Sequence, residues 1–419
     1  MPVTPGVAPL AISSALLSMA WTGYGMLLRR AARNLPLLQA TLDSEGSGPA
    51  PPSPPSLSVV VTARDEAEGI ESTVQRLLAQ RYPGLQIVVV DDRSSDGTAA
   101  ILDRLQAHVD SPRLEVIHNR ELPPGWLGKC HACHLGAARA RGEWLLFMDG
   151  DVELARDDLL ARVVALAEER RLDHVALVPD QRPVSATQSA LLMVFAQMYL
   201  LASRLHEADR DRRRGGGGIG AFNLVRRPAY DRIGGHRLLK MDPADDFKLG
   251  RLLKESGARQ RFFDAIGLVR CPWHKGALNV ARGLEKNFFA GFNYSLLEMI
   301  GHTALGLALA FGPAAAAVAG SLLAASAPRP TTVLLAGWIP LILQALVVWS
   351  GARIWTQRQG GSPLLLAALY PPAILLLLAA AWNSAIRVLA RGGIVWRDTF
   401  YPLGDLRAGL VPRGSGRRL

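Results

Sequence analysis

Acidic side chains follow three apolar runs of the sequence, at the point where each run ends. In chain order they are Asp65, Glu66, Asp91, Asp92, Asp149 and Asp151. Two carboxylates one residue apart, as in Asp149-Gly150-Asp151, suit a hard divalent cation that also binds phosphate oxygens. A D-x-D pair on its own is more often a solvated turn. The pair gains weight only if the fold brings other functional residues to it.

Residues 128–136, GKCHACHLG, contain the C-x-x-C-H spacing of c-type haem attachment. CPWH at 271–274 adds a second Cys–His pair, so Cys130, Cys133, Cys271 and His274 offer a zinc ligand set. Haem attachment would need an extracytoplasmic site, and the zinc set would join segments far apart in the chain. We expect the pattern to be incidental.

Short apolar runs alternate with helical stretches from residue 57 to residue 180. The expected strands are 57–63, 86–92, 114–119, 143–151 and 174–180, and the expected helices are 67–80, 96–108, 129–141 and 155–170. Continuous apolar strands that alternate with helices indicate a parallel sheet covered on both faces. Ligands bind at the carboxyl ends of such strands, which is where the acids fall. The sequence therefore predicts an α/β domain with one acidic site.

Four further segments are almost free of charge and long enough to cross a bilayer, which takes about 20 apolar residues. They are 8–28, 302–325, 332–350 and 363–386. Arg29, Arg30 and Arg33 follow the first segment, so the positive-inside rule places the domain after it in the cytoplasm. The uncharged stretch 187–203 is short for a span and fits a helix in the membrane interface or the core. We expect a multi-pass protein of the cell inner membrane.

The charge balance and the three cysteines narrow the class of protein further. The 419 residues carry a formal net charge of +11, which favours contact with anionic lipid headgroups. Nucleic acid is an unfavoured partner, since no helix-turn-helix, zinc-finger or RNA-binding signature is present. Three cysteines make no disulfide framework.

Five motifs occur in order between residues 57 and 300. They are VVVTARDE, VVVDDRSSDGT, GKxxAxxxG, LLFMDGD and DPADDFKLGRLLKESG. In this order the chain resembles the family 2 glycosyltransferases, and the resemblance implies a GT-A fold, Rossmann-like with a mostly parallel sheet. It implies a nucleotide-sugar donor and a Mg²⁺ or Mn²⁺ ion.

The resemblance also assigns roles to single residues. Donor or nucleotide binding falls to Ala63, Asp65, Glu66, Asp92, Lys129 and Asp149. Asp65 stands where the family often has Asn, and Lys129 begins a helix that would face the diphosphate. Asp149 and Asp151 would hold the metal. Asp246, preceded by Asp245, matches the position of the catalytic base. Without the upstream motifs, it would instead be interpreted as an acid at a helix N-terminus, where the helix dipole favours it. Trp273 and His274 are weaker candidates for the acceptor side.

The same resemblance predicts the reaction. The processive members carry a Q-x-x-R-W motif that is missing after Asp246, so single transfer is favoured. LPPGWLGK at 122–129 is similar to segments of hopanoid-associated and carotenoid (diaponeurosporenoate-type) glycosyltransferases. We expect an inverting enzyme that moves one sugar, from a UDP-sugar, to a hydroxyl or carboxyl of a membrane lipid or isoprenoid. The alternatives are a non-catalytic GT-A membrane scaffold and a Cys/His metal-binding membrane protein.

The expected domains are a transmembrane helix at 1–29, a Pro/Ser/Gly linker at 30–56, a cytoplasmic GT-A domain at 57–295, about three transmembrane segments at 296–390 and a basic amphipathic tail at 391–419. If all three later segments cross, the arginine-rich tail lies outside, against the charge rule. Pro371 and Pro372 make the last segment a candidate re-entrant one. We expect a cytoplasmic tail, with residues 396–401 along the membrane interface near the site.

Overall fold

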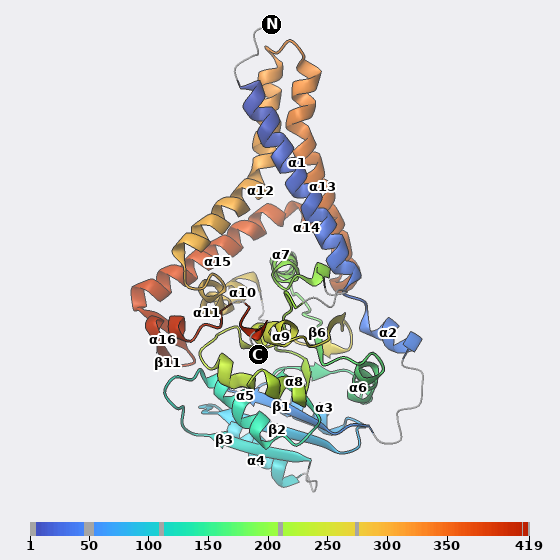
Figure 1. Cartoon of the computed structure of the whole chain (residues 1–419), viewed down its shortest axis with the longest axis vertical. Coiled ribbons are helices and arrows are strands. Elements are labelled where there is room, and N and C mark those ends of the chain that lie inside the picture. The colour runs from blue at the N-terminus through green and yellow to red at the C-terminus, as the bar shows by residue number, and fades with distance from the viewer. Residues whose placement is uncertain are drawn as a thin grey trace. The chain divides into compact units, whose positions relative to one another are not determined.

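The structure is a computed structural model that describes residues 6–45, 54–108, 113–207, 213–272, 276–412 and 414–417. The chain divides into two compact units, which we describe separately (Figure 1). The helical unit comes from the described parts of Met1–Ala31, Pro183–Leu201 and His274–Arg387. The α/β unit comes from those of Ala32–Arg182, Ala202–Trp273 and Val388–Leu419.

A seven-stranded sheet forms the centre of the α/β unit, in the order β3-β2-β1-β4-β7-β6-β8. Its strands are β1 (Leu57–Ala63), β2 (Leu85–Asp92), β3 (Leu114–Asn119), β4 (Trp144–Asp149), β6 (His174–Val178), β7 (Asn223–Arg226) and β8 (Gln260–Asp264). The pairs β1–β2, β2–β3, β1–β4 and β6–β8 are parallel, and β7 runs antiparallel to both of its neighbours. The predicted mostly parallel α/β sheet is confirmed.

Helices cover both faces of this sheet because its strands are apolar on both sides. They are α3 (Ile70–Leu78), α4 (Thr98–His108), α5 (Gly128–Arg139), α6 (Leu159–Glu169), α8 (Arg227–Arg232) and α9 (Asp245–Glu255). Val59 and Val61 point into the core that α3, α4 and α6 share, whereas Val60 points into the core with α5, α8 and α9. This alternation along β1 fixes which helices lie on which face.

Shorter elements complete the α/β unit. They are α2 (Leu38–Glu45), β5 (Glu153–Leu154), η1 (Leu205–Glu207), η2 (Gly235–Leu239), β9 (Val269–Arg270), β10 (Gly393–Trp396), β11 (Thr399–Pro402), α16 (Leu403–Ala408) and η3 (Ser415–Arg417). Helix α2 falls inside the stretch predicted as linker. The elements from β10 onward fold onto this unit. The Glu255 carboxylate on α9 accepts hydrogen bonds from the backbone N–H groups of Gly414 and Gly416.

The helical unit holds the apolar segments. Its helices are α1 (Val7–Arg33), α7 (Ala186–Ala202), α10 (Ala277–Gly283), α11 (Glu285–Gly291), α12 (Leu296–Ala324), α13 (Pro330–Gln359), α14 (Pro363–Ala368) and α15 (Tyr370–Arg391). Among the described residues, α1, α12, α13 and α15 are long and apolar enough to cross a membrane. Large apolar side chains stay exposed along them, with Leu297 80% and Leu322 71% exposed, as lipid-facing positions require.

Close packing inside this unit depends on small residues and on side-chain hydrogen bonds to backbone carbonyls. Small residues let α12 and α13 approach closely, because a Cβ on Gly337 would lie 2.6 Å from the carbonyl oxygen of Ala316. Pro313 within α12 has no N–H for the carbonyl of Leu309. The indole N–H of Trp21 on α1 donates to that carbonyl at 3.1 Å instead. Gln344 on α13 donates to the carbonyl of Ala310 at 2.8 Å and to that of Leu309 at 3.4 Å.

Candidate active site

The loops after β1 and β2 are tied together by side-chain hydrogen bonds at the carboxyl edge of the sheet. Asp65, with a positive φ of 55°, accepts bonds from the backbone N–H and the hydroxyl of Ser95 at 2.7 and 3.1 Å. The backbone N–H of Glu66 donates to the hydroxyl of Thr98 at 2.9 Å. Asp65 and the N–H of Glu66 therefore tie the loop after β1 to the loop after β2.

Asp92, at the end of β2, is buried and fully paired. Its two oxygens accept a fork of hydrogen bonds from Arg93, at 3.0 and 2.9 Å, and Asn119 donates to it at 2.8 Å. Asp92 lies directly against the backbone of Gly128, at the start of α5. The neighbouring Asp91 pairs with the ring of His118 at 2.9 Å.

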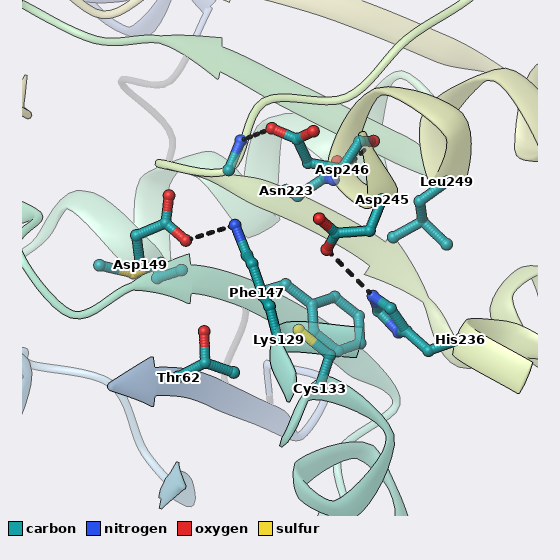
Figure 2. Close-up of a pocket in the computed structure, with 12 residues that line it drawn as sticks. Thr62, Lys129, Cys133, Phe147, Asp149, Asn223, His236, Asp245, Asp246 and Leu249 are labelled. Carbon is teal, nitrogen blue, oxygen red and sulfur yellow. Dashed lines mark hydrogen bonds and ion pairs between the residues drawn. The ribbon is translucent and has the colours of Figure 1, made fainter. Parts of the chain in front are cut away.

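Lys129 and the D-x-D turn meet at the end of β4. The Lys129 ammonium lies 2.7 Å from Asp149, and both side chains are mostly buried. Figure 2 shows the two pointing toward one another from α5 and β4. Thr73 on α3 donates to the carbonyl of Gly150 at 3.0 Å and so fixes the turn between Asp149 and Asp151.

Gly220 lies where the D-x-D turn and helix α9 meet. Its N–H donates to Asp246 at 2.8 Å, and its carbonyl accepts from the N–H of Asp149 at 3.1 Å. A Cβ at position 220 would lie 2.6 Å from Oδ2 of Asp149, 3.1 Å from Oδ2 of Asp246 and 3.3 Å from Nζ of Lys129. Three charged groups from three elements therefore converge on one backbone position, and only glycine leaves room for them.

Asp245 faces the other side of the same pocket. Its carboxylate lies 4.0 Å from Nε2 of His236, whose Nδ1 pairs with the hydroxyl of Tyr230 at 2.9 Å (Figure 2). Cys133 on α5 completes this buried corner, and one ligand atom from each of Cys133, His236 and Asp245 lies within 4.8 Å of the others. The two consecutive acids of α9 thus point in different directions, Asp245 into the protein and Asp246 toward the D-x-D turn.

Burial and charge shift the pKa values of these groups strongly. Burial raises the pKa of Asp151 to about 6, and the nearby Asp149 and Glu66 add to the shift. Burial raises the pKa of Asp245 to about 7 and also raises that of Asp246, although Lys129 opposes both shifts. Burial alone would lower the pKa of Lys129, but the surrounding carboxylates outweigh it and raise that pKa well above its ordinary value. The site gathers more negative charge than its lysine offsets.

A buried polar network supports the site from behind. Nε2 of His174 on β6 donates to Asn223 on β7, and Nδ1 accepts from Gln260 on β8. Gln260 also donates to the carbonyls of Gly217 and Gly250, at 3.0 and 2.9 Å. The network therefore holds the glycine-rich loop before β7 against α9.

The structure brings several predicted site residues together in one narrow pocket, whose lining includes Lys129, Asp149, Asp245 and Asp246. Ala63 is buried at the end of β1. Glu66, which packs against the D-x-D turn, and Asp151, its second acid, are not among the residues that line this pocket. Asp92 lies farther along the edge, against Gly128. Trp273 and His274 lie outside the described residues.

The proposed zinc set does not assemble within the part of the chain that the structure describes. Cys130, Cys133 and Cys271 are buried free thiols, and no group of metal-ligand atoms there combines them. Cys271 instead lies on the D-x-D side, where Asp151 and Asp149 add to the burial that raises its pKa. His274, the fourth member, lies outside the described residues.

Some residues at the site were not expected from the sequence. Gly220, Asn223 and His236 contribute room, a hydrogen bond and a buried ring, and no motif pointed to them. Arg397, which lies in the segment 396–401 that we expected near the site, makes a contact that the sequence did not predict, 2.9 Å from Glu66. Their roles depend on contacts between elements distant in sequence.

Comparisons with known proteins agree with this arrangement. Residues 58–234 match Glycosyl transferase family 2. Two 4,4'-diaponeurosporenoate glycosyltransferases, from Staphylococcus aureus (strain bovine RF122 / ET3-1) and Staphylococcus haemolyticus (strain JCSC1435), are 22% and 23% identical over 237 residues. Each match covers 56% of this chain, and it spans 61% and 62% of the relatives' own lengths.

One solved structure shares the architecture of most of the chain. It is a mannosyltransferase from Pyrobaculum calidifontis in complex with GDP-Man and Mn²⁺, with 23% identity and a TM-score of 0.50. The match covers 87% of this chain and 99% of that one. At this identity the likeness shows the fold, which is GT-A. Residues 58–234 therefore match the family 2 glycosyltransferases, and the chain has the GT-A fold.

Proposed function

We propose that this protein is a membrane-bound inverting glycosyltransferase that moves one sugar from a nucleotide-diphosphate donor, a UDP-sugar, to a membrane lipid or isoprenoid. The observation that carries the proposal is the convergence of Lys129, Asp149 and Asp246 around Gly220. Sugar transfer from a diphosphate requires a cation, a carboxylate that can bind a metal and a carboxylate with a raised pKa, and one pocket holds all three.

The acids of the D-x-D turn fit a divalent cation. Carboxylate oxygens of Asp149 and Asp151 are the hard ligands that Mg²⁺ and Mn²⁺ prefer. Asp151 has a pKa of about 6 because burial and two neighbouring acids disfavour its charge, and a bound cation would reverse that penalty. When bound, the ion would offset the negative charge that builds on the departing diphosphate.

Asp246 is the residue we assign as general base. The N–H of Gly220 and its own neighbour Phe247 bond its two oxygens, at 2.8 and 2.7 Å, so the carboxylate is held in one orientation. Burial raises the pKa of Asp246 toward neutral pH, and a carboxylate with a pKa near the working pH accepts a proton from an attacking hydroxyl most effectively. Direct attack by the acceptor in a single displacement inverts the configuration at the sugar.

Lys129 carries the positive charge on the protein side of the pocket. It starts helix α5, and the N-terminal end of a helix itself favours anions. With Asp149 at 2.7 Å, the ammonium is positioned to contact the diphosphate beside the metal ligands. Asp245 points away toward His236, and we propose that it helps to position Asp246 rather than accepting the proton itself.

The acceptor assignment is supported by the helical unit and the relatives. Four helices among the described residues could cross a membrane, and the curated relatives are named for a diaponeurosporenoate acceptor. A lipid-soluble acceptor explains why a sugar-transfer domain is joined to such helices. The arginines in the last turns of α1, Arg29, Arg30 and Arg33, support an inner-membrane, multi-pass protein with its transferase domain in the cytoplasm.

The test is incubation of membranes containing the protein with labelled UDP-sugars, and GDP-sugars in parallel, followed by lipid extraction. Asp246→Asn and Asp151→Asn should each lower transfer by roughly 10²–10⁴-fold, since each removes a base or a metal ligand. Chelation with EDTA should stop transfer by the wild type, and added Mn²⁺ should restore it.

Asp157→Asn is the matched control, because Asp157 forms a surface pair with Arg81 and is 52% exposed. It should transfer at the wild-type rate. Full activity of Asp246→Asn would refute the mechanism. Donor binding with no transfer to any lipid by the wild type would instead favour the non-catalytic scaffold.

A further inference from the structure

The two strands β10 and β11 form a C-terminal hairpin, residues 393–402, with a defined inner and outer face. Ile394 and Tyr401 pair across it and are buried, whereas Val395 and Phe400 on the opposite face are each 50% exposed. The two-residue turn, Arg397 and Asp398, has φ values of 48° and 63°. These are the backbone angles of the tight turns that match strand twist, so the hairpin holds Arg397 at its tip.

The tip of the C-terminal hairpin contacts the loop after β1. Nη2 of Arg397 lies 2.9 Å from Oε1 of Glu66, and its Nη1 lies 3.9 Å from Oδ2 of Asp65. The Arg397 side chain is 41% exposed, so one side of the guanidinium stays accessible to a ligand. The contact therefore leaves the cation available.

Two further contacts join the hairpin to the rest of the strand-end edge. Arg93, in the loop after β2, donates to the hydroxyl of Thr399 at 3.4 Å. The backbone N–H of Gly128, where α5 begins, donates to the hydroxyl of Tyr401 at 3.3 Å. The hairpin thus touches three of the four segments that carry predicted donor-binding residues, the fourth being the end of β4 with Asp149.

Glu66 connects Arg397 to the D-x-D turn. A Cβ on Gly150 would lie 3.4 Å from Cγ of Glu66, so the Glu66 side chain packs against the turn between Asp149 and Asp151. Arg397 is consequently one side chain away from the acids that we assign to the metal.

The chain after the hairpin anchors it to the helix of the catalytic base. Nζ of Lys248 on α9 donates to the carbonyl of Val411 at 3.2 Å. Together with the bonds from Gly414 and Gly416 to Glu255, this contact fastens the tail along α9. The hairpin is therefore held at the site and is not a free end.

We propose that the C-terminal hairpin is a wall of the donor site and that Arg397 binds the diphosphate of the nucleotide-sugar. The inference rests on the proposed function. Without donor, the guanidinium balances Glu66 and Asp65. A divalent ion held by Asp149 and Asp151 would add positive charge beside Glu66, and the fork of Arg397 would then be available for phosphate oxygens, the geometry that guanidinium recognises best.

The experiment measures binding of UDP and GDP to the purified full-length protein with Mn²⁺, together with KM and kcat for donor and acceptor. Arg397→Asn removes the cation, and asparagine tolerates the positive φ of the turn. We expect its nucleotide Kd and donor KM to rise roughly tenfold to a hundredfold, the range for a lost charged hydrogen bond. The KM for the acceptor should stay unchanged.

Two further variants separate recognition from folding. Arg397→Lys keeps the charge and loses the fork, so it should recover only part of the affinity. Asp398→Asn, in the same turn, should bind and transfer as the wild type. Thermal unfolding of all variants gives the folded fraction on which each Kd is scaled.

The outcomes distinguish this inference from the proposed function. If the wild type binds nucleotide and transfers sugar, but Arg397→Asn has the same Kd and donor KM, the hairpin does not contact the donor and only this inference falls. If Arg397→Lys and Arg397→Asn are equally impaired in stability and affinity, the role is structural. If the wild type neither binds nor transfers, the proposed function falls and takes the inference with it.

Discussion

Gly220→Ala offers a direct test of the geometry at the site. The added methyl would lie 2.6 Å from Oδ2 of Asp149, closer than real Cβ contacts allow, and 3.1 Å from Oδ2 of Asp246. At least one of these carboxylates must move, although both backbone hydrogen bonds of residue 220 can persist. A displacement of about 1 Å at reacting groups costs roughly 10²-fold in rate, or about 3 kcal/mol of barrier.

The cost in stability should be smaller than the cost in rate. Over-packing at a buried site typically costs about 1–3 kcal/mol, and here the crowded groups are side-chain ends beside an open pocket. We therefore expect Gly220→Ala to fold, with a slightly lower Tm and a kcat about a hundredfold below that of the wild type. Binding of nucleotide should weaken as well, since the methyl also crowds Asp149 and Lys129, which we assign to the metal and the diphosphate.

The assay is steady-state transfer of labelled sugar to extracted lipid, with thermal unfolding in detergent measured alongside. Gly404→Ala on α16 is the matched control, because a Cβ there meets nothing within 4 Å. It should have wild-type kinetics. Wild-type kcat in Gly220→Ala would show that Asp149 and Asp246 do not act at this point, and the reasoning from Gly220 would be wrong.

Two further expectations concern stability. Burial lowers the pKa of His174 from 6.5 to about 4, so the unfolded chain binds the extra proton first as pH falls. The contribution of this residue to the free energy of unfolding is complete above pH 6.5 and falls by about 3 kcal/mol toward pH 4. The free energy of unfolding should therefore depend less steeply on pH in His174→Gln than in the wild type, and equal slopes would contradict the assignment. Trp21→Phe should cost about 1 kcal/mol by removing the closer of the two side-chain donors to the Leu309 carbonyl, the other being Gln344 at 3.4 Å. It should cost less in a Pro313→Ala background, where residue 313 regains its N–H; identical costs in both backgrounds would rule out this pairing.

The central strands could be predicted because their sequence signal is local. Runs such as LSVVVTA and QIVVVDD are apolar on both faces, and each forms a strand within one residue of its expected bounds, β1 (Leu57–Ala63) and β2 (Leu85–Asp92). The strand β8, QRFFD, was not expected, because it is short and begins with two polar residues. Its place beside β6 is set by the sheet rather than by its own pattern.

The candidate site was predictable only in part, for the same reason. Acids at strand ends and Lys129 at a helix start follow from position in the alternating pattern. Gly220 could not be singled out among many glycines, because its lack of a side chain matters only once three elements converge on it. Residues 396–401 were expected near the site, but not as a hairpin, since the turn is Arg-Asp rather than the Asn-Gly or Asp-Gly that signals such a turn.

The position of the C-terminal hairpin in the chain has a consequence for biosynthesis. Residues 393–402 follow all four long apolar helices in the sequence, yet they contact loops that the ribosome makes more than two hundred residues earlier, as the 331-residue separation of Arg397 and Glu66 shows. If the hairpin forms the wall of the donor site that we propose, that site stays incomplete until the last of those helices has been synthesised. A nascent chain that has not yet reached residue 393 would then hold its donor poorly.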